Sequence, residues 1–560
     1  MKVRNLCVAL GFGASQVAAL YAGIPRFARS TGAVRGIEKT EEPAAVNTGS
    51  AIKAYSMSVP IDHFPNETKY EPHSKDHFNL RYWADVSHYR KGGPVFIIHS
   101  GEFSGEGRLP FLEKGIGFNI TQITGAVGIV LEHRYYGGSW PTENATTESY
   151  RFLTTEQAAA DVAFFSKNLK IPGHDKLSLA SPESPHILYG GSYAGGLVAI
   201  ARKTYPDVFW GAISSSGVTA AIDDFWQYHE ATRWFAPGEC SPTIQHLTAI
   251  VDHALQHEEA EFKAIFGLRD LRRDQFAGYL ADQLPSAQDT NWDPELDDTS
   301  FGTFCAVVTS NWLLFKSTEY LIDRVRRYVE APGLVQGGNS RQLTMRMLNY
   351  IGYIKDRVNK DKAACKAVTD GSHQDPKRCK TPLQQCLSTQ CQKGTTEISK
   401  NSWERSWLYQ MCTEWGFFIN GASTPHDRLA MIPRALTAKS ASLTCEAVFG
   451  IKSRPQVETI NKHGGFNFSY PRVAFIDGKQ DPWRCAGVHA DGLPDRSSTW
   501  TEPYELMDWG VHQWDENGQG DKQFWEGDMS QAPQQVANMQ GKELEIVKKW
   551  LKEFRKHGPI

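Results

Sequence analysis

Unbroken apolar runs that end in polar or glycine-rich turns recur along the chain and predict buried β-strands. The runs cover 94–99, 126–131, 186–189, 211–216 and 471–476. A strand that is apolar at every position is buried on both faces, which is typical of a mostly parallel sheet with helices on either side. A helical pattern at 155–169, opened by a Thr-x-x-Gln capping pattern at Thr154, fits between two of these strands. The pattern therefore predicts an α/β fold.

The long stretch between the fourth and fifth runs has a different character. Segments 247–266, 317–329 and 341–358 show helical periodicity. Seven of the nine cysteines that follow the N-terminal region also lie at 217–440, within this stretch. We therefore expect an α/β core that is interrupted by a large, mainly helical, disulfide-braced cap. The expected division is core at 51–216, cap at 217–440 and core again at 441–560.

The first residues have the features of a secretory signal. The basic residues Lys2 and Arg4 precede a short apolar segment, 6–22, which contains glycines and a glutamine and is a poor membrane span. We therefore expect a signal peptide at 1–22 and a flexible tail or pro-segment at 23–50. The protein should be secreted to the outside of the cell, with a vacuolar or lysosomal lumen as the alternative.

Cysteines and glycosylation sequons agree with export. Nine cysteines remain after the signal, an odd number that allows at most four disulfides and leaves one thiol. The spacing of Cys379, Cys386 and Cys391 fits no zinc motif, so disulfides are the better interpretation and no metal site is expected. The Asn-x-Ser/Thr sequons offer glycosylation at Asn66, Asn119, Asn144 and Asn467.

Composition limits the partners that this chain can have. Sixty basic residues against 63 acidic ones give a net charge of −3, which provides no electrostatic footprint for nucleic acid. A hydrophobic content of 41% excludes a disordered chain. An apolar stripe near the end of the chain predicts a packed closing helix, with membrane binding as the less favoured alternative: Leu544, Val547, Leu551 and Phe554. We expect a soluble monomer or homodimer that binds neither nucleic acid nor membranes.

Candidate chemistry centres on the segment 189–196, which reads Tyr-Gly-Gly-Ser-Tyr-Ala-Gly-Gly. A buried strand leads into Ser192 between small residues and a helix follows, which is the pattern of a nucleophile elbow. The turn leaves no room for bulk at positions 190 and 194, and it places the seryl oxygen at a helix N-terminus. The alternative is a glycine-rich turn of a nucleotide-binding fold, but the chain has no G-x-G-x-x-G motif or Walker lysine.

A nucleophilic serine needs a base and a carboxylate that orients the base. In α/β folds with a nucleophile elbow, the acid precedes the histidine in the chain. Asp477 and Asp481 follow the strand at 471–476, and both are candidate acids. We predict His512 as the base, because the chain has room for one more strand between it and the acid. His489 lies too close to Asp481 for such a strand.

The oxyanion hole requires two backbone N–H donors. One is expected from Tyr193, directly after the nucleophile. The other is expected from Gly101 in the glycine-rich loop 100–107, whose backbone can approach a substrate closely. A plain surface loop remains the alternative for 100–107.

Short motifs that are spread over most of the mature chain carry a family resemblance. They are V-P-I-D-H-F at 59–64, the run at 78–83, E-H-R-Y-Y-G at 132–137, L-T-T-E-Q-A at 153–158, G-G-S-Y at 190–193, W-L-Y-Q-M-C-T-E at 407–414 and D-P-W at 481–483. Together they resemble the prolyl carboxypeptidase and dipeptidyl peptidase II family of serine peptidases, most closely its secreted fungal branch. The resemblance implies an α/β-hydrolase fold with a helical cap and the triad Ser192, Asp481 and His512.

The resemblance also implies a substrate class. It implies cleavage of proline-containing peptides on the carboxyl side of proline, and sometimes of alanine, without a metal or cofactor. Candidates for binding the substrate are Glu102, Trp407, Glu414 and Trp483. The family often has Asn-Gly before the acid, whereas this chain has Ile-Asp-Gly at 476–478, so Asp477 remains a rival acid.

Several alternatives stay open at the level of the sequence. The enzyme could be a dipeptidyl peptidase, a carboxypeptidase or a prolyl endopeptidase, because the geometry of the cap decides which part of a peptide enters. A secreted esterase or lipase would share the elbow and the triad. A catalytically silent binding protein would keep the fold without a working site.

Overall fold

The computed structural model of the chain describes residues 52–294, 296–334, 339–368, 403–518 and 532–557. The predicted signal peptide at 1–22 and the tail at 23–50 lie outside these residues. The cysteine cluster Cys379, Cys386 and Cys391 also lies outside them.

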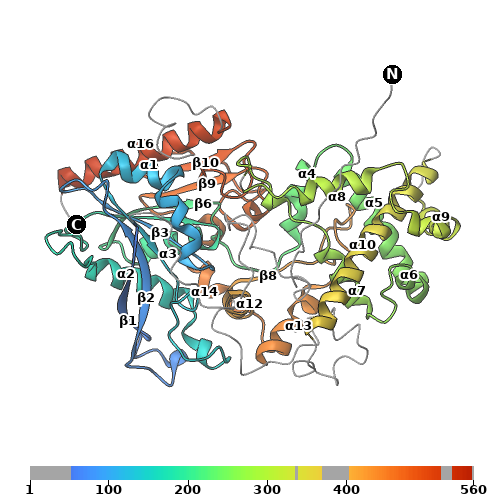
Figure 1. Ribbon diagram of the computed structural model, residues 1–560, viewed down its shortest axis with the longest axis horizontal. Helices are drawn as coiled ribbons and strands as arrows, with labels where there is room; N and C mark the ends of the chain where they lie inside the picture. Colours follow the sequence, from blue (N-terminus) through green and yellow to red (C-terminus); the bar gives the residue numbers. More distant parts are fainter. Residues whose placement is uncertain (1–51, 295, 335–338, 369–402, 519–531, 558–560) are drawn as a thin grey trace.

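An eight-stranded sheet forms the centre of the α/β part (Figure 1). In spatial order its strands are β1 Lys53–Pro60, β2 His77–Asp85, β4 Val127–Leu131, β3 Val95–His99, β5 His186–Gly191, β6 Phe209–Ser215, β9 Val473–Gly478 and β10 Tyr504–Met507. The pairings β1–β2 and β2–β4 are antiparallel, and all pairings from β4 to β10 are parallel. The five apolar runs correspond to β3, β4, β5, β6 and β9, so the predicted mostly parallel sheet is confirmed.

Helices cover both faces of this sheet and explain the apolar strands. They are α1 Gly115–Thr124 and α16 Gln534–His557 on one face, and α2 Thr155–Asn168 and α3 Tyr193–Thr204 on the other. In β3, Val95 and Ile97 pack in the cluster that contains α2 and α3, whereas Phe96 and Ile98 pack in the cluster that contains α1 and α16. Successive side chains of a strand point to opposite faces, so neighbouring positions on both faces are apolar.

The predicted closing helix is confirmed as α16, and its apolar stripe packs against the sheet. Val547 is fully buried, and the indole N–H of Trp210 in β6 donates to the carbonyl oxygen of Trp550 at 2.7 Å. Within the described ranges, no helix combines the length and the apolar character that crossing a membrane requires.

The chain between β6 and β9 forms a mainly helical cap, which Figure 1 shows beside the sheet. Its first helices after α4 Glu230–Phe235 are α5 Cys240–His257, α6 Glu259–Ile265, α7 Arg273–Asp282, α8 Ser300–Thr309, α9 Ile322–Glu330 and α10 Ser340–Val368. Later helices are α12 Trp403–Gln410, α13 Ala438–Phe449 and α14 Glu458–Asn461. Helices α5 to α10 enclose a hydrophobic cluster of their own, separate from the two clusters of the sheet.

Covalent and backbone links hold the cap to itself and to the core. The disulfide Cys240–Cys305 joins α5 to α8, and Cys412–Cys445 joins the segment after α12 to α13. The short parallel pair β7 Ile222–Asp224 and β8 Gly416–Phe418 brings the two ends of the insertion together. The chain therefore has the α/β-hydrolase fold with a disulfide-braced helical cap, as the sequence predicts.

Three carboxyl groups are buried together where α16 meets the loop after β10: Asp515, Glu516 and Glu543. Arg108 donates to both oxygens of Glu516, at 3.1 and 2.9 Å. Neither carboxylate oxygen of Glu543 has a hydrogen-bond partner among the described residues. Burial, with the neighbouring charges of Asp515 and Glu516, raises the pKa of Glu543 well above its usual range.

We predict that Glu543→Gln stabilises the protein at alkaline pH but not at acid pH. A carboxyl whose folded-state pKa exceeds its unfolded-state value of 4.5 makes the free energy of unfolding fall as the pH rises above that value. The neutral amide removes this dependence. Melting temperatures at about pH 4 and about pH 8 should show a gain only at the higher pH. The exposed Glu545→Gln in the same helix is the control, and an equal gain at both pH values would contradict the prediction.

Candidate active site

The predicted site residues gather at one edge of the sheet. Ser192 follows β5, Gly101 follows β3, Asp481 follows β9 and His512 follows β10. These four strands are parallel, so their carboxyl ends lie at the same edge, where α/β folds place their active sites.

Ser192 occupies a sharp, strained turn between β5 and α3. Its backbone has φ 60° and ψ −127°, a conformation that non-glycine residues rarely adopt. A Cβ atom on Gly190 would lie 2.3 Å from the carbonyl oxygen of Ala194, so only glycine fits there. The tight elbow that the small residues predict is present.

Asp481 and His512 form a buried hydrogen-bonded pair. Nδ1 of His512 lies 2.7 Å from Oδ2 of Asp481, and Oδ1 of Asp481 accepts the backbone N–H of Trp483 at 2.8 Å. Burial lowers the pKa of His512, but the charge and the hydrogen bond of Asp481 outweigh burial, so the pKa is raised above 6.5. The charged form of the imidazole is therefore stabilised by a carboxylate.

Gln513 connects this pair to the serine turn. Its backbone N–H donates to Oγ of Ser216 at 2.9 Å, and a Cβ atom on Gly191 would lie 2.1 Å from its Nε2. Oγ of Ser192 and Nε2 of His512 are both buried, and neither has a hydrogen-bond partner among the described residues. The two groups form no hydrogen bond with each other, and catalytic hydrogen bonds often tighten only when substrate binds.

A second Asp–His pair lies beside the first. Nδ1 of His489 is 2.6 Å from Oδ2 of Asp477, and the His489 ring packs on Tyr504 with centroids 3.7 Å apart. The sequence leaves Asp477 as a rival acid and sets His489 aside, but it gives no sign that the two residues bind each other. In the part of the chain that the structure describes, Gln513 links the pair Asp481–His512, and not the pair Asp477–His489, to the serine turn.

The two predicted oxyanion donors differ in their surroundings. Tyr193 is the first residue of α3, directly after Ser192. Gly101 has φ +70°, and a Cβ atom added to it would lie 3.3 Å from the Cβ of Ala194. Its N–H, however, donates to Nδ1 of His99 at 3.1 Å. The amide of Gly101 is thus engaged, and it would have to leave His99 before it could bind an oxyanion.

A chain of hydrogen bonds fixes the side chain of Tyr193 from behind. Nδ1 of His133 donates to the carbonyl oxygen of Arg134 at 2.6 Å, so its Nε2 accepts the hydroxyl of Tyr193 at 2.9 Å. That hydroxyl accepts from Nε2 of Gln410 at 2.8 Å, and Tyr136 donates to the other end of Gln410. Burial lowers the pKa of His133 to about 4, which keeps the ring neutral and this direction of donation fixed.

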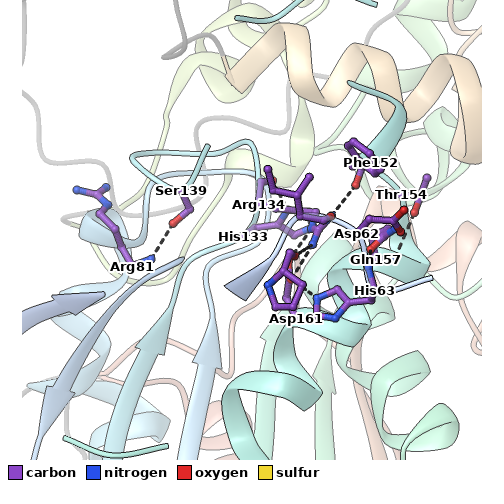
Figure 2. A network of polar contacts seen from close by, with 12 residues as sticks. Asp62, His63, Arg81, His133, Arg134, Ser139, Phe152, Thr154, Gln157 and Asp161 are labelled. Atoms are coloured by element: carbon purple, nitrogen blue, oxygen red, sulfur yellow. Dashed lines mark hydrogen bonds and ion pairs between the residues drawn. The ribbon is translucent and has the colours of Figure 1, made fainter. Parts of the chain in front are cut away.

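Three of the sequence motifs meet in one buried network (Figure 2). Arg134 donates two hydrogen bonds to Asp161, at 2.5 and 2.7 Å, and Nε2 of His63 lies 2.8 Å from the same carboxylate. Gln157 donates to Asp62 at 2.8 Å and accepts the backbone N–H of His63 at 2.9 Å. These motif residues hydrogen-bond to one another or to Asp161, and they stabilise the core.

Aromatic residues surround Trp483, one of the predicted substrate-binding residues. Its ring lies 5.5, 5.2 and 5.1 Å from the rings of Phe225, Tyr228 and Phe417. Its indole N–H donates to Oε1 of Gln288 at 2.5 Å. Trp407, another candidate, is fully buried against Tyr193 with centroids 5.4 Å apart.

The two candidate carboxylates have different environments. Glu414 accepts the backbone N–H and the hydroxyl of Thr155, at 2.9 and 3.0 Å, and thus caps the N-terminus of α2. Glu102 is 2% exposed, and its Oε2 has no partner among the described residues. Burial raises the pKa of Glu102 to about 7, while Arg108 and His512 draw it down.

One predicted glycosylation site requires correction. Asn119 is buried within α1, 3% exposed, so a glycan has no room there. Asn66, Asn144 and Asn467 are exposed, and glycosylation there stays a prediction.

Comparisons with known proteins place the chain among serine peptidases. A family model described as "Serine carboxypeptidase S28" matches residues 60–274 and 336–498, which include Ser192 and Asp481. The "Probable extracellular serine carboxypeptidase" of Arthroderma benhamiae is 41% identical over 511 residues, covering 90% of this chain and 69% of that protein. The "Thymus-specific serine protease" of Mus musculus is 27% identical over 487 residues, covering 81% and 83%.

Solved structures resemble the chain only distantly. An esterase of Pyrobaculum calidifontis is 14% identical with a TM-score of 0.21, and the match covers 32% of this chain and 50% of that one. The chain thus spans about half the length of this solved structure.

We predict that Glu102→Gln lowers the pKa of His512. An ionised carboxyl near an imidazole stabilises the imidazolium, so its loss should lower that pKa. NMR titration of the His512 ring, assigned through His512→Gln, measures the shift. Glu106→Gln, an exposed carboxyl of the same loop that pairs with Arg81, is the control. An unchanged His512 titration would contradict electrostatic contact between the two groups.

Proposed function

The chain belongs to the serine carboxypeptidase S28 family and is a serine-type peptidase, and we propose that it cleaves peptide bonds after proline through Ser192, Asp481 and His512. The observation that carries this proposal is the buried hydrogen bond between Asp481 and His512 beside the strained turn of Ser192. A serine, an imidazole and an orienting carboxylate are the parts that acyl transfer requires.

In the proposed mechanism, Nε2 of His512 takes the proton of Ser192 as Oγ attacks the carbonyl carbon of proline. The imidazolium then gives that proton to the leaving amine, and water hydrolyses the acyl-enzyme by the same route. Asp481 holds Nδ1–H in place and stabilises the positive ring, in agreement with the raised pKa of His512.

The amide of Tyr193 is the proposed first donor to the oxyanion. The second is Gly101, once its N–H leaves His99. Loss of a single oxyanion donor typically slows acyl transfer by about 100- to 1000-fold. The bonds from His133 and Gln410 to the Tyr193 hydroxyl support this assignment, because they keep the first turn of α3 in place.

We propose that Trp483 and its aromatic neighbours form the slot for the proline ring. The backbone N–H of Trp483 donates to the proposed acid, Asp481, and the rings of Phe225, Tyr228 and Phe417 pack around its indole, which supports this assignment. A small apolar slot favours a pyrrolidine ring and accepts alanine less well. Trp407 would support this slot by packing against Tyr193. Glu102, whose Oε2 has no partner among the described residues, would bind a positive group of the substrate.

Secretion completes the proposal. The relative from Arthroderma benhamiae is named extracellular, which supports a cleaved signal at 1–22 and glycans at Asn66, Asn144 and Asn467. We propose that the mature enzyme, a monomer or homodimer, acts on proline-containing peptides outside the cell.

We predict that the two aspartates that follow β9 separate in a mutational test. Asp481→Asn should lower kcat/KM by about 10⁴-fold, because the amide no longer orients and stabilises the imidazole. The matched Asp477→Asn should lower it less than about tenfold, because its partner is His489. A serine-directed fluorophosphonate should label the wild type and not Ser192→Ala. The reverse ranking of the aspartates would reassign the acid, and persistent labelling would remove Ser192 as the nucleophile.

We predict that products end at proline. Peptides that differ only at one position, with proline, alanine, glycine or leucine there, should be cut fastest after proline, and mass spectrometry reads the products. Versions blocked at either terminus show whether cleavage needs a free end. Trp483→Ala should reduce kcat/KM for the proline peptide by at least about tenfold, whereas exposed Trp312→Ala should not. Products that end mainly at leucine, or faster turnover of aryl esters alone, would contradict the proposed specificity.

A further inference from the structure

A cavity with a volume of about 430 Å³ lies between the cap and the two loops that carry the acid and the base. Gln480 and Val511, which line it from the core side, directly precede Asp481 and His512. Its other walls come from α4, from the segment after it, and from the cap residues around the start of α8. The cavity therefore lies next to the proposed catalytic pair, and neither Asp481 nor His512 is among its lining residues.

Hydrogen bonds fix the cap wall of the cavity to the loop of His512. The indole N–H of Trp514 donates to the carbonyl oxygen of Thr290 at 2.9 Å, and Trp292 donates to the carbonyl oxygen of Trp514 at 2.9 Å. Thr290 itself lines the cavity. Because these bonds join the two elements, the distance from the cavity to the imidazole is set by the fold.

We propose that this cavity binds the part of the peptide that follows the scissile bond, and that it favours a basic side chain there. The inference rests on the proposed acyl-enzyme mechanism. In that mechanism the leaving amine takes its proton from His512, so the residues attached to that amine must pass beside the imidazole. A cavity whose wall includes the residue before His512 is placed to receive them.

The lining of the cavity indicates the chemistry of the side chain. Phe235, Pro237, Phe301 and Val511 provide apolar surface, and none of the described lining residues is basic. Two half-buried carboxylates, Asp297 and Asp298, supply negative charge. Lysine or arginine can lay its aliphatic stem on apolar surface and present its charge to carboxylates, whereas an acidic side chain meets like charge.

Local hydrogen bonds hold both carboxylates in position. Oδ1 of Asp297 accepts the backbone N–H of Asn291 at 2.9 Å, and Oδ1 of Asp298 accepts that of Ser300 at 2.8 Å. Asparagine can accept the same bonds through its own Oδ1, so Asp→Asn changes the charge and keeps the local structure.

The charge test uses three peptides with lysine, leucine or glutamate directly after the proline, together with a proline arylamide that has no residue there. The wild type should favour lysine over glutamate in kcat/KM by about five- to tenfold. Asp297→Asn combined with Asp298→Asn should bring that ratio close to one and leave the arylamide unchanged. Asp323→Asn, an exposed carboxylate of α9, is the matched control and should keep the wild-type ratio.

A second variant tests the space rather than the charge. A Cβ atom on Gly302 of α8, which lines the cavity, meets nothing within 4 Å, so Gly302→Phe should fill the cavity without strain. We expect it to raise KM for all three peptides, and also for the arylamide, because the aryl ring is attached to the same leaving amine. Gly541→Phe, at an equally open position in α16, is the control.

The outcomes separate this inference from the proposed function. If none of the three peptides is cleaved after proline, the proposed function itself is overturned. Cleavage after proline with equal rates for the lysine and glutamate peptides, or charge selectivity that follows residues before the proline, would overturn the inference alone.

Discussion

A fully buried guanidinium, that of Arg134, sets the conditions for the rest of the structure. Arginine keeps its charge in proteins, and a buried charge that loses its partner costs about 3–5 kcal/mol. Asp161 in α2 takes two of its hydrogen bonds, and the carbonyl oxygens of Ile61 and Phe152 take two others at 3.0 Å. Three segments far apart in the chain therefore have one low-energy arrangement around this side chain (Figure 2).

The fixed position of Arg134 reaches the site through the residue before it. The carbonyl oxygen of Arg134 holds Nδ1 of His133, and Nε2 of the same ring holds the hydroxyl of Tyr193. Tyr193 begins the helix that follows Ser192. Because these hydrogen bonds hold the Tyr193 side chain, they also fix the residue that directly follows the strained turn. The E-H-R-Y-Y-G motif thus supports the serine turn, whereas the proposed reacting groups lie in other segments.

Sequence reasoning succeeds where a local pattern has one structural cause. Burial on both faces makes the middle of β3 to β6 apolar, and the collision at Gly190 forces small residues around Ser192. It fails where partners are distant and carry no periodic signal. Nothing near Asp477 indicates that His489 binds it, and nothing near Glu414 indicates that it caps α2. Asn119 shows the same limit, because a sequon does not reveal on which face of α1 it lies.

The site gathers polar groups that the folded chain leaves without partners. Oγ of Ser192, Nε2 of His512 and Oε2 of Glu102 are buried and unsatisfied among the described residues, and each such group costs about 1–3 kcal/mol. The apolar packing on both faces of the sheet and the satisfied hydrogen bonds of Arg134 can offset that cost. The buried groups that lower the stability of the fold are then the ones that can still form hydrogen bonds. A peptide substrate of the proposed reaction, whose carbonyl and amide form those hydrogen bonds, would recover the free energy that burial of the unpartnered groups costs.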